Sequence, residues 1–308
     1  MATIDLSTPP PPPAGVLDAL PRRVSLTLPE LRLVAERAGG APLPFELEEQ
    51  GTADALGDRL GPSHASSEDK AYAAALTSLH DPESSLARRG LLVDTAIDEG
   101  LLGAVGLLAT PSVALDIDVA AGGLRAKAWH RLHAGAVASL ATPDGIVFEL
   151  AWFPTDQWGD ELSRVTVLPE DVALRHSDVP PHVDLPYALA DAASEAVRSG
   201  RSDLLSVLVA DHAGEVRARD GAVLPDLEAV AVLSSLFTES RGRMRALVAD
   251  VSGEATTVVG VVSWVLLDDG WRTLRPRRAA GADRLEVDRV EPGDLARELA
   301  PVLAEVTA

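Results

Sequence analysis

The sequence lacks two residue types and is poor in a third, and each shortage removes a class of function. It has no cysteine, which excludes disulfides, thiolate metal sites and cysteine nucleophiles. It has no asparagine, which excludes N-glycosylation. Lys70 and Lys127 are its only lysines. With a net charge of −20 and a pI near 4.6, the chain is poorly suited to nucleic acid or an anionic membrane, because both attract clustered cations.

Long apolar segments are also missing. The longest, Leu101–Ala109, is far shorter than the roughly 20 residues that span a bilayer. No basic region followed by an apolar one opens the chain, so we expect no signal peptide and a cytoplasmic location. The hydrophobic content of 46% is ordinary for a folded protein, and 308 residues can form one large domain or two ordinary ones.

Two stretches, 101–173 and 227–296, follow a similar order of segments, which suggests an internal duplication. Each begins with an apolar, helix-period segment and continues with an alternating, strand-like run. Each then has a Gly-led apolar run that ends at a tryptophan, followed by a Pro-x-Asp-aliphatic-Ala sequence. The matched segments are Leu115–Val119 with Met244–Val248, Gly145 to Trp158 with Gly260 to Trp271, and Pro169–Ala173 with Pro292–Ala296.

Hydrophobic periodicity predicts an α+β fold, because runs of strands are bracketed by helices. The predicted strands are 24–28, 113–120, 124–132, 136–141, 146–153, 243–250, 257–267, 271–276 and 285–290. The predicted helices are 29–37, 68–79, 83–89, 94–108, 187–198, 203–211, 227–237 and a last one that begins near Asp294, with a loop over 51–67.

Proline content sets the predicted domain organisation. Residues 1–21 include Pro9–Pro13 and form a Pro-rich, disordered tail, since a proline run cannot join a helix or a central strand. Three prolines in 178–186 mark a connector between an N-terminal half, 22–177, and a C-terminal half, 187–308.

The sequence has no recognisable catalytic motif. Gly100, Gly103 and Gly106 miss the spacing of a dinucleotide-binding loop and fall within a helical pattern. The pair Ser63–His64 lies in a predicted loop, which is not the setting of a serine nucleophile.

Two groups of polar side chains keep a site open as an alternative. His176, Asp178, His182 and Asp184 have the chemistry of metal ligands, but the prolines among them favour a polar linker. Asp116 and Asp118 share one strand face, where they could act as an acid–base pair or form the wet side of a sheet. His130 and His133 are three apart on a strand, so they face opposite sides and cannot share one ion unless the strand bends.

Large aromatic residues are few, at 4% of the chain, and they cluster. The cluster comprises Trp152, Phe153, Trp158, Trp264 and Trp271. Core packing explains most of them, but a partly exposed aromatic patch would suit a protein partner, since tryptophan and phenylalanine anchor interfaces.

The order of segments resembles the EspG family, the secretion-associated cytosolic proteins of type VII (ESX) systems. The segments that carry this resemblance are Leu26–Leu31 with Leu43–Pro44, Leu107–Pro111 with Val113–Val119 and Ala136–Ala141, Trp264–Arg275, and Val290–Leu295. The resemblance implies quasi-two-fold halves in which a central, mainly antiparallel sheet is flanked by helical bundles. It implies no catalysis and no cofactor.

The resemblance also implies a partner, because such proteins hold the hydrophobic tip of PPE proteins in PE–PPE pairs before export. The expected contact positions are Trp264, Trp271, Leu236 and Phe237. Two alternatives remain: an enzyme or ligand-binding protein that uses the acidic and histidine groups, and a non-catalytic, homodimeric structural protein.

Overall fold

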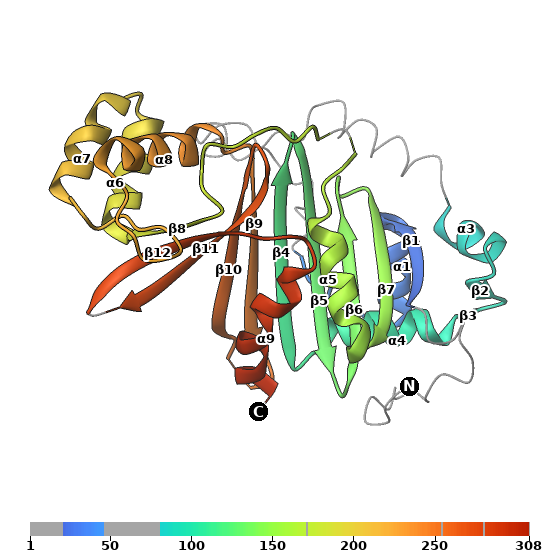
Figure 1. Ribbon diagram of the computed structural model, residues 1–308. Coiled ribbons are helices and arrows are strands. Elements are labelled where there is room, and N and C mark those ends of the chain that lie inside the picture. Colours follow the sequence, from blue (N-terminus) through green and yellow to red (C-terminus); the bar gives the residue numbers. More distant parts are fainter. Residues whose placement is uncertain (1–20, 46–80, 171, 254, 280, 308) are drawn as a thin grey trace, which may run out of the picture. The chain divides into compact units, whose positions relative to one another are not determined.

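The computed structural model describes residues 21–45, 81–170, 172–253, 255–279 and 281–307 (Figure 1). Within them, ten strands form one sheet with the hydrogen-bonded order β1-β7-β6-β5-β4-β9-β10-β11-β12-β8. The same residues form eight α-helices and a small ribbon of Leu92–Val93 (β2) and Ala96–Ile97 (β3). The predicted α+β class is confirmed. The predicted tail, the loop 51–67 and the helix 68–79 lie outside the described residues.

Two halves of the chain repeat one order of elements: a strand, then helices, then four consecutive strands, then a helix. The first half contains Arg22–Thr27 (β1), Leu28–Arg37 (α1), Pro82–Arg88 (α3), Glu99–Ala109 (α4), Val113–Ala121 (β4), Leu124–His133 (β5), Ala136–Thr142 (β6), Val147–Pro154 (β7) and Trp158–Thr166 (α5). The second contains His182–Pro186 (β8), Tyr187–Arg198 (α6), Leu205–Asp211 (α7), Asp226–Thr238 (α8), Gly242–Asp250 (β9), Thr257–Leu267 (β10), Gly270–Ala279 (β11), Ala282–Arg289 (β12) and Asp294–Thr307 (α9). In each half the first strand pairs with the fourth of the later strands, β1 with β7 and β8 with β12, both antiparallel.

The equivalences between the halves differ from those expected from the sequence. Trp158 begins helix α5, whereas Trp271 lies within β11, so the two tryptophans do not correspond. The counterpart of α9 is α5, a nine-residue helix that is missing from the sequence-based prediction. Trp158, Leu162 and Val165 recur at helical spacing in α5, but the helix is short and Glu161 and Thr166 are also buried in it.

The predicted connector 178–186 holds a strand in its second part. Strand β8 pairs with β12 from Asp288↔His182 to Arg284↔Pro186. Proline is compatible with this position because β8 is the last strand of the sheet, and Pro186 ends it. The predicted helix 94–108 also begins later, since Asp98 caps it by accepting a 2.9 Å hydrogen bond from the Leu101 amide.

The described residues form two compact units: those within Met1–Ala114 and Trp129–Thr155, and those within Leu115–Ala128 and Asp156–Ala308. In the first unit, helices α1 and α4 pack against strand β7, and α4 also packs against β6. Helix α1 begins with a capping box between Thr27 and Glu30. The core of this unit includes Leu26, Leu101, Val105, Leu140, Phe148 and Leu150.

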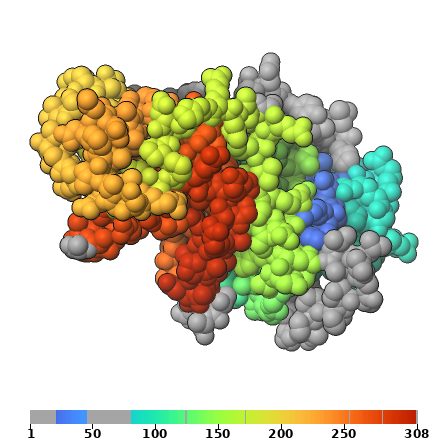
Figure 2. Space-filling view, in the orientation of Figure 1, coloured from blue at the N-terminus to red at the C-terminus, as the bar shows by residue number. Residues whose placement is uncertain are grey.

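In the second unit, helices cover both faces of the strands. Helices α5 and α9 pack side by side, and α9 packs on β9 and β10 (Figures 1 and 2). Trp264 points to this side, since its Nε1 donates to Glu298 of α9 at 2.8 Å. The neighbouring Val265 points to the other side, because side chains alternate along a strand. We call this other side the bundle face.

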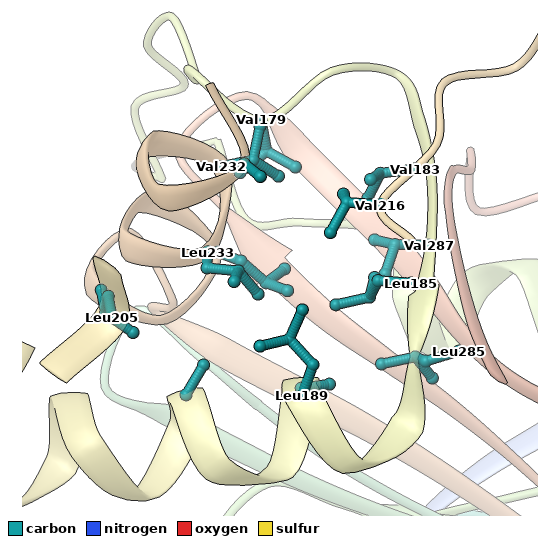
Figure 3. Close-up of a cluster of buried hydrophobic side chains, with 14 of the residues drawn as sticks. Val179, Val183, Leu185, Leu189, Leu205, Val216, Val232, Leu233, Leu285 and Val287 are labelled. Carbon is teal, nitrogen blue, oxygen red and sulfur yellow. The ribbon is translucent and has the colours of Figure 1, made fainter. Parts of the chain in front are cut away.

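Helices α6, α7 and α8 pack on part of the bundle face (Figure 3). Leu189 of α6 and Leu233 of α8 are fully buried against Leu185 of β8 and Val287 of β12. Each Å² of apolar surface buried here stabilises the fold by about 25 cal/mol, so these fully buried leucines and valines hold the bundle on the strands.

Candidate protein-binding groove

A groove of about 670 Å³ lies on the bundle face of the second unit. Its walls are contributed by α6, the end of α8, and strands β9 to β12, with Asp118 from β4. The apolar side chains that line it include Tyr187, Phe237, Val261, Leu274 and Pro276. Tyr187 is 47% exposed and Val261 is 40% exposed, so the groove presents apolar surface to solvent.

An irregularity in strand β10 extends this apolar surface. Val261 pairs with Leu247, and Val258 pairs with Ala249, so a bulge lies between Val258 and Gly260. Leu247 and Ala249 are two residues apart and share a face, which places Val258 and Val261 on one face as well. Without the bulge, valines three residues apart would point to opposite sides. Val258 is 55% exposed, and we call Val258 and Val261 together the apolar strip.

Two arginines stand beside the apolar strip. Arg243 and Arg245 lie two residues apart on β9 and line the groove. In the strand register they lie opposite Val265 and Ser263 of β10. Both are exposed, and in the described part of the chain neither has a carboxylate within ion-pair distance. Arg241, two residues earlier, differs: its Nε lies 3.0 Å from Asp268 and its guanidinium also donates to backbone carbonyls.

Neither a protein-family model nor a curated protein sequence matches the chain. A solved structure does match: the Mycobacterium tuberculosis type VII secretion system chaperone EspG5 in complex with the PE25–PPE41 dimer. The likeness has a TM-score of 0.56 and covers 93% of this chain and 95% of that chain, at 11% sequence identity. This chain has the EspG fold. At that identity the comparison establishes the fold alone. Among the described residues, no helix is long and apolar enough to cross a membrane.

The expected contact positions occupy two environments within the EspG fold. Leu236, Phe237 and Trp264 line the groove, but Leu236 and Trp264 are 2% and 1% exposed. Trp271 is also buried, and its Nε1 donates to the backbone oxygen of Thr166 at 2.9 Å. Phe237 alone of the four is partly exposed. The direct contact expected for the two tryptophans and Leu236 therefore does not fit their burial, and Phe237 stays a prediction.

The histidine and acidic residues singled out in 176–184 do not come together. His176 and Asp178 are exposed, with 3.8 Å between His176 Nε2 and Asp178 Oδ1. His182 lies on β8, where its Nδ1 is 2.7 Å from Asp288 Oδ1. Asp184 is partly enclosed by arginines: Arg277 and Arg284 each lie 2.9 Å from its carboxylate.

One group in the described residues has metal-ligand geometry, namely His182, Glu286 and Asp288. Arginines already compensate its carboxylates. Arg275 is 2.9 Å from Glu286 and 3.7 Å from Asp288, and Arg219 is 3.3 Å from Asp288. A divalent cation there would compete with the two guanidinium groups for the same carboxylate oxygens, so the residues present do not favour a metal.

The remaining polar candidates are also dispersed. Asp118 is exposed in the groove, and Asp116 is half-buried on the same strand face. His130 is buried on β5, where desolvation, with the nearby charge of Arg131, lowers its pKa to about 3. His133 is half-buried on the same strand. Ser63–His64 lies outside the described residues. The described residues among these groups do not converge on one pocket with a base, a nucleophile and an oxyanion site.

Sequence reasoning missed the residues that define the surface: Val258, Val261, Arg243 and Arg245. A signal existed for the arginines, because positions 243 and 245 share a face of the predicted strand 243–250. A signal existed for the valines too, because Gly260 is an isolated glycine within the predicted strand 257–267, and such a glycine suggests a bulge.

Proposed function

We propose that this protein is a cytosolic chaperone of a type VII secretion system that binds the hydrophobic tip of a PPE-type protein, within a PE–PPE pair, and keeps the pair soluble for export. One observation carries the proposal: an exposed apolar strip runs into a groove on a chain with the EspG fold. The EspG5 structure of the same fold contains a PE25–PPE41 dimer.

The mechanism is capping. An apolar tip of the partner covers Val258, Val261 and the groove, which removes aggregation-prone surface from water on both sides. Leu236 is buried in the wall of the groove, and Phe237 contacts the partner at its edge. The net charge of −20 keeps the complex soluble through electrostatic repulsion between complexes.

The test is co-purification of this protein with a co-expressed PE–PPE pair. We expect Val261→Asp to weaken binding by about 30-fold or more, because it buries a charge at the centre of an apolar contact. Val207→Asp is the matched control, since Val207 is 57% exposed on α7 and does not line the groove.

Both variants are to be compared by thermal unfolding, so that a loss of binding is separated from a loss of folding. If no folded PE–PPE pair binds the wild-type protein, the proposed function is wrong. If Val261→Asp binds as the wild type does, the proposed surface is wrong.

A further inference from the structure

We infer that the partner segment that enters the groove carries a carboxylate beside its apolar surface, and that Arg243 and Arg245 recognise this carboxylate. This inference rests on the proposed function and names a chemical requirement of the same site. An apolar tip without an acidic residue would satisfy the proposed function but not this inference.

The geometry gives the two arginines a common direction. They are two residues apart on β9, so both side chains leave the sheet on the bundle face. Their strand partners, Val265 and Ser263, also line the groove. Both guanidinium groups therefore stand at the apolar strip, where a partner side chain meets them as it buries its neighbours.

Arg243 and Arg245 are available to a partner although the chain is rich in carboxylates. The chain has 27 Lys and Arg against 47 Asp and Glu, so acidic residues are available to pair with cations. Five of the six arginines of the adjacent strands β11 and β12 form ion pairs, and Arg278 is the exception among these described residues: the five are Arg272, Arg275, Arg277, Arg284 and Arg289. In the part of the chain that the structure describes, Arg243 and Arg245 form none, although Asp118 and Asp191 also line the groove.

The chemistry of the groove selects a carboxylate over a more highly charged anion. A guanidinium group binds a carboxylate through two parallel N–H···O bonds. A phosphate group would bring about two negative charges close to Asp118 and Asp191, which repel it. An aspartate or glutamate within an apolar segment matches both the two cations and the apolar surface.

The closing experiment measures the dissociation constant of the complex with the PE–PPE pair that the wild-type protein binds. We expect the double substitution Arg243→Gln with Arg245→Gln to raise it about 10-fold or more at low salt. Arg88→Gln is the control, because Arg88 is exposed on α3 and does not line the groove. Raising the salt from about 50 to about 500 mM should weaken the wild-type complex and affect the double variant much less.

A charge reversal identifies the partner residue. Each Asp and Glu of the PPE tip is changed to Arg in turn, and one such change should restore binding to the double variant Arg243→Glu with Arg245→Glu. Restoration by one position only, with weaker binding to the wild-type protein, is the expected result.

Three outcomes overturn the inference, and each is distinct. If Val261→Asp abolishes binding while the double glutamine variant binds normally, the partner contact is neutral and the proposed function stands. If the double glutamine variant converts a dimer of this protein into a monomer in light scattering, the arginines serve self-association. If no PE–PPE pair binds the wild-type protein, the proposed function and this inference fail together.

Discussion

Glu298 anchors helix α9 to the sheet, and removing its carboxylate should destabilise the protein strongly. The side chain is 8% exposed. Its Oε2 accepts hydrogen bonds from Trp264 Nε1 at 2.8 Å and from Thr273 Oγ1 at 2.9 Å, and its Oε1 accepts one from Arg275 at 2.7 Å. Burial alone would lower the pKa of Arg275, but Glu298 and Glu286 raise it above its ordinary value.

The magnitude follows from the groups that lose their acceptor. Trp264 is 1% exposed and Thr273 is 2% exposed, so water reaches neither donor in the native structure. A buried donor without a partner costs about 1–3 kcal/mol. Arg275 retains Glu286 and Asp288 and is half-exposed, so it adds little. We expect Glu298→Ala to lower the free energy of unfolding by about 3–5 kcal/mol, with roughly half that loss for Glu298→Gln.

The assay is urea unfolding followed by tryptophan fluorescence, since Trp264 itself lies at the altered site. The control is Glu305→Ala, because Glu305 is exposed on the same helix. A loss below about 1 kcal/mol for Glu298→Ala, similar to the control, would refute the assignment of α9 to this face of the sheet.

Two further predictions concern pH and strand spacing. The folded-state pKa of His130 lies below its ordinary value, so the unfolded chain binds a proton that the folded chain does not, and the free energy of unfolding should fall by about 2 kcal/mol between pH 6.5 and 5. His130→Leu should flatten this slope in pH-dependent urea unfolding. An unchanged slope would contradict the burial of His130. Gly242→Ala should cost about 3 kcal/mol or more, because the new Cβ would lie 2.3 Å from the Ala120 carbonyl oxygen. Gly103→Ala is its control, with no atom within 4 Å of the added Cβ, and equal melting temperatures for the two variants would contradict the close approach of the strands.

Hydrophobic periodicity was sufficient to predict a helix or strand wherever one face of the element is buried and the other is exposed to water. The predicted helix 187–198 and the predicted strand 257–267 match α6 and β10 at both ends. Helix α5 is different, since its nine residues leave room for only one apolar repeat, Trp158, Leu162 and Val165, and Glu161 and Thr166 are buried beside it. Its counterpart α9 is longer, and its Leu295 and Leu299 are fully buried, so the helical period is clear.

The binding surface was only partly predictable, because exposure depends on what covers a residue. Trp264 and Val261 belong to one apolar strand, yet α9 covers the tryptophan while the valine is left open on the bundle face. Phe237 follows the buried Leu236 in α8 and reaches the groove edge. Sequence alone could identify the strand and the helix, but not where the α6–α8 bundle stops on the sheet.

Strands β4 and β9 hold equivalent places in the two halves and are neighbours in the sheet, yet their side chains on the bundle face carry charges of opposite sign. On the bundle face, β4 carries Asp116 and Asp118, and β9 carries Arg243 and Arg245. Because the two halves repeat one order of elements, the backbone alone would let a partner segment bind in two opposite directions. For the partner proposed above, the opposite charges on the two strands would make these two directions unequal, so a segment with an acidic and a basic end would dock in one of them.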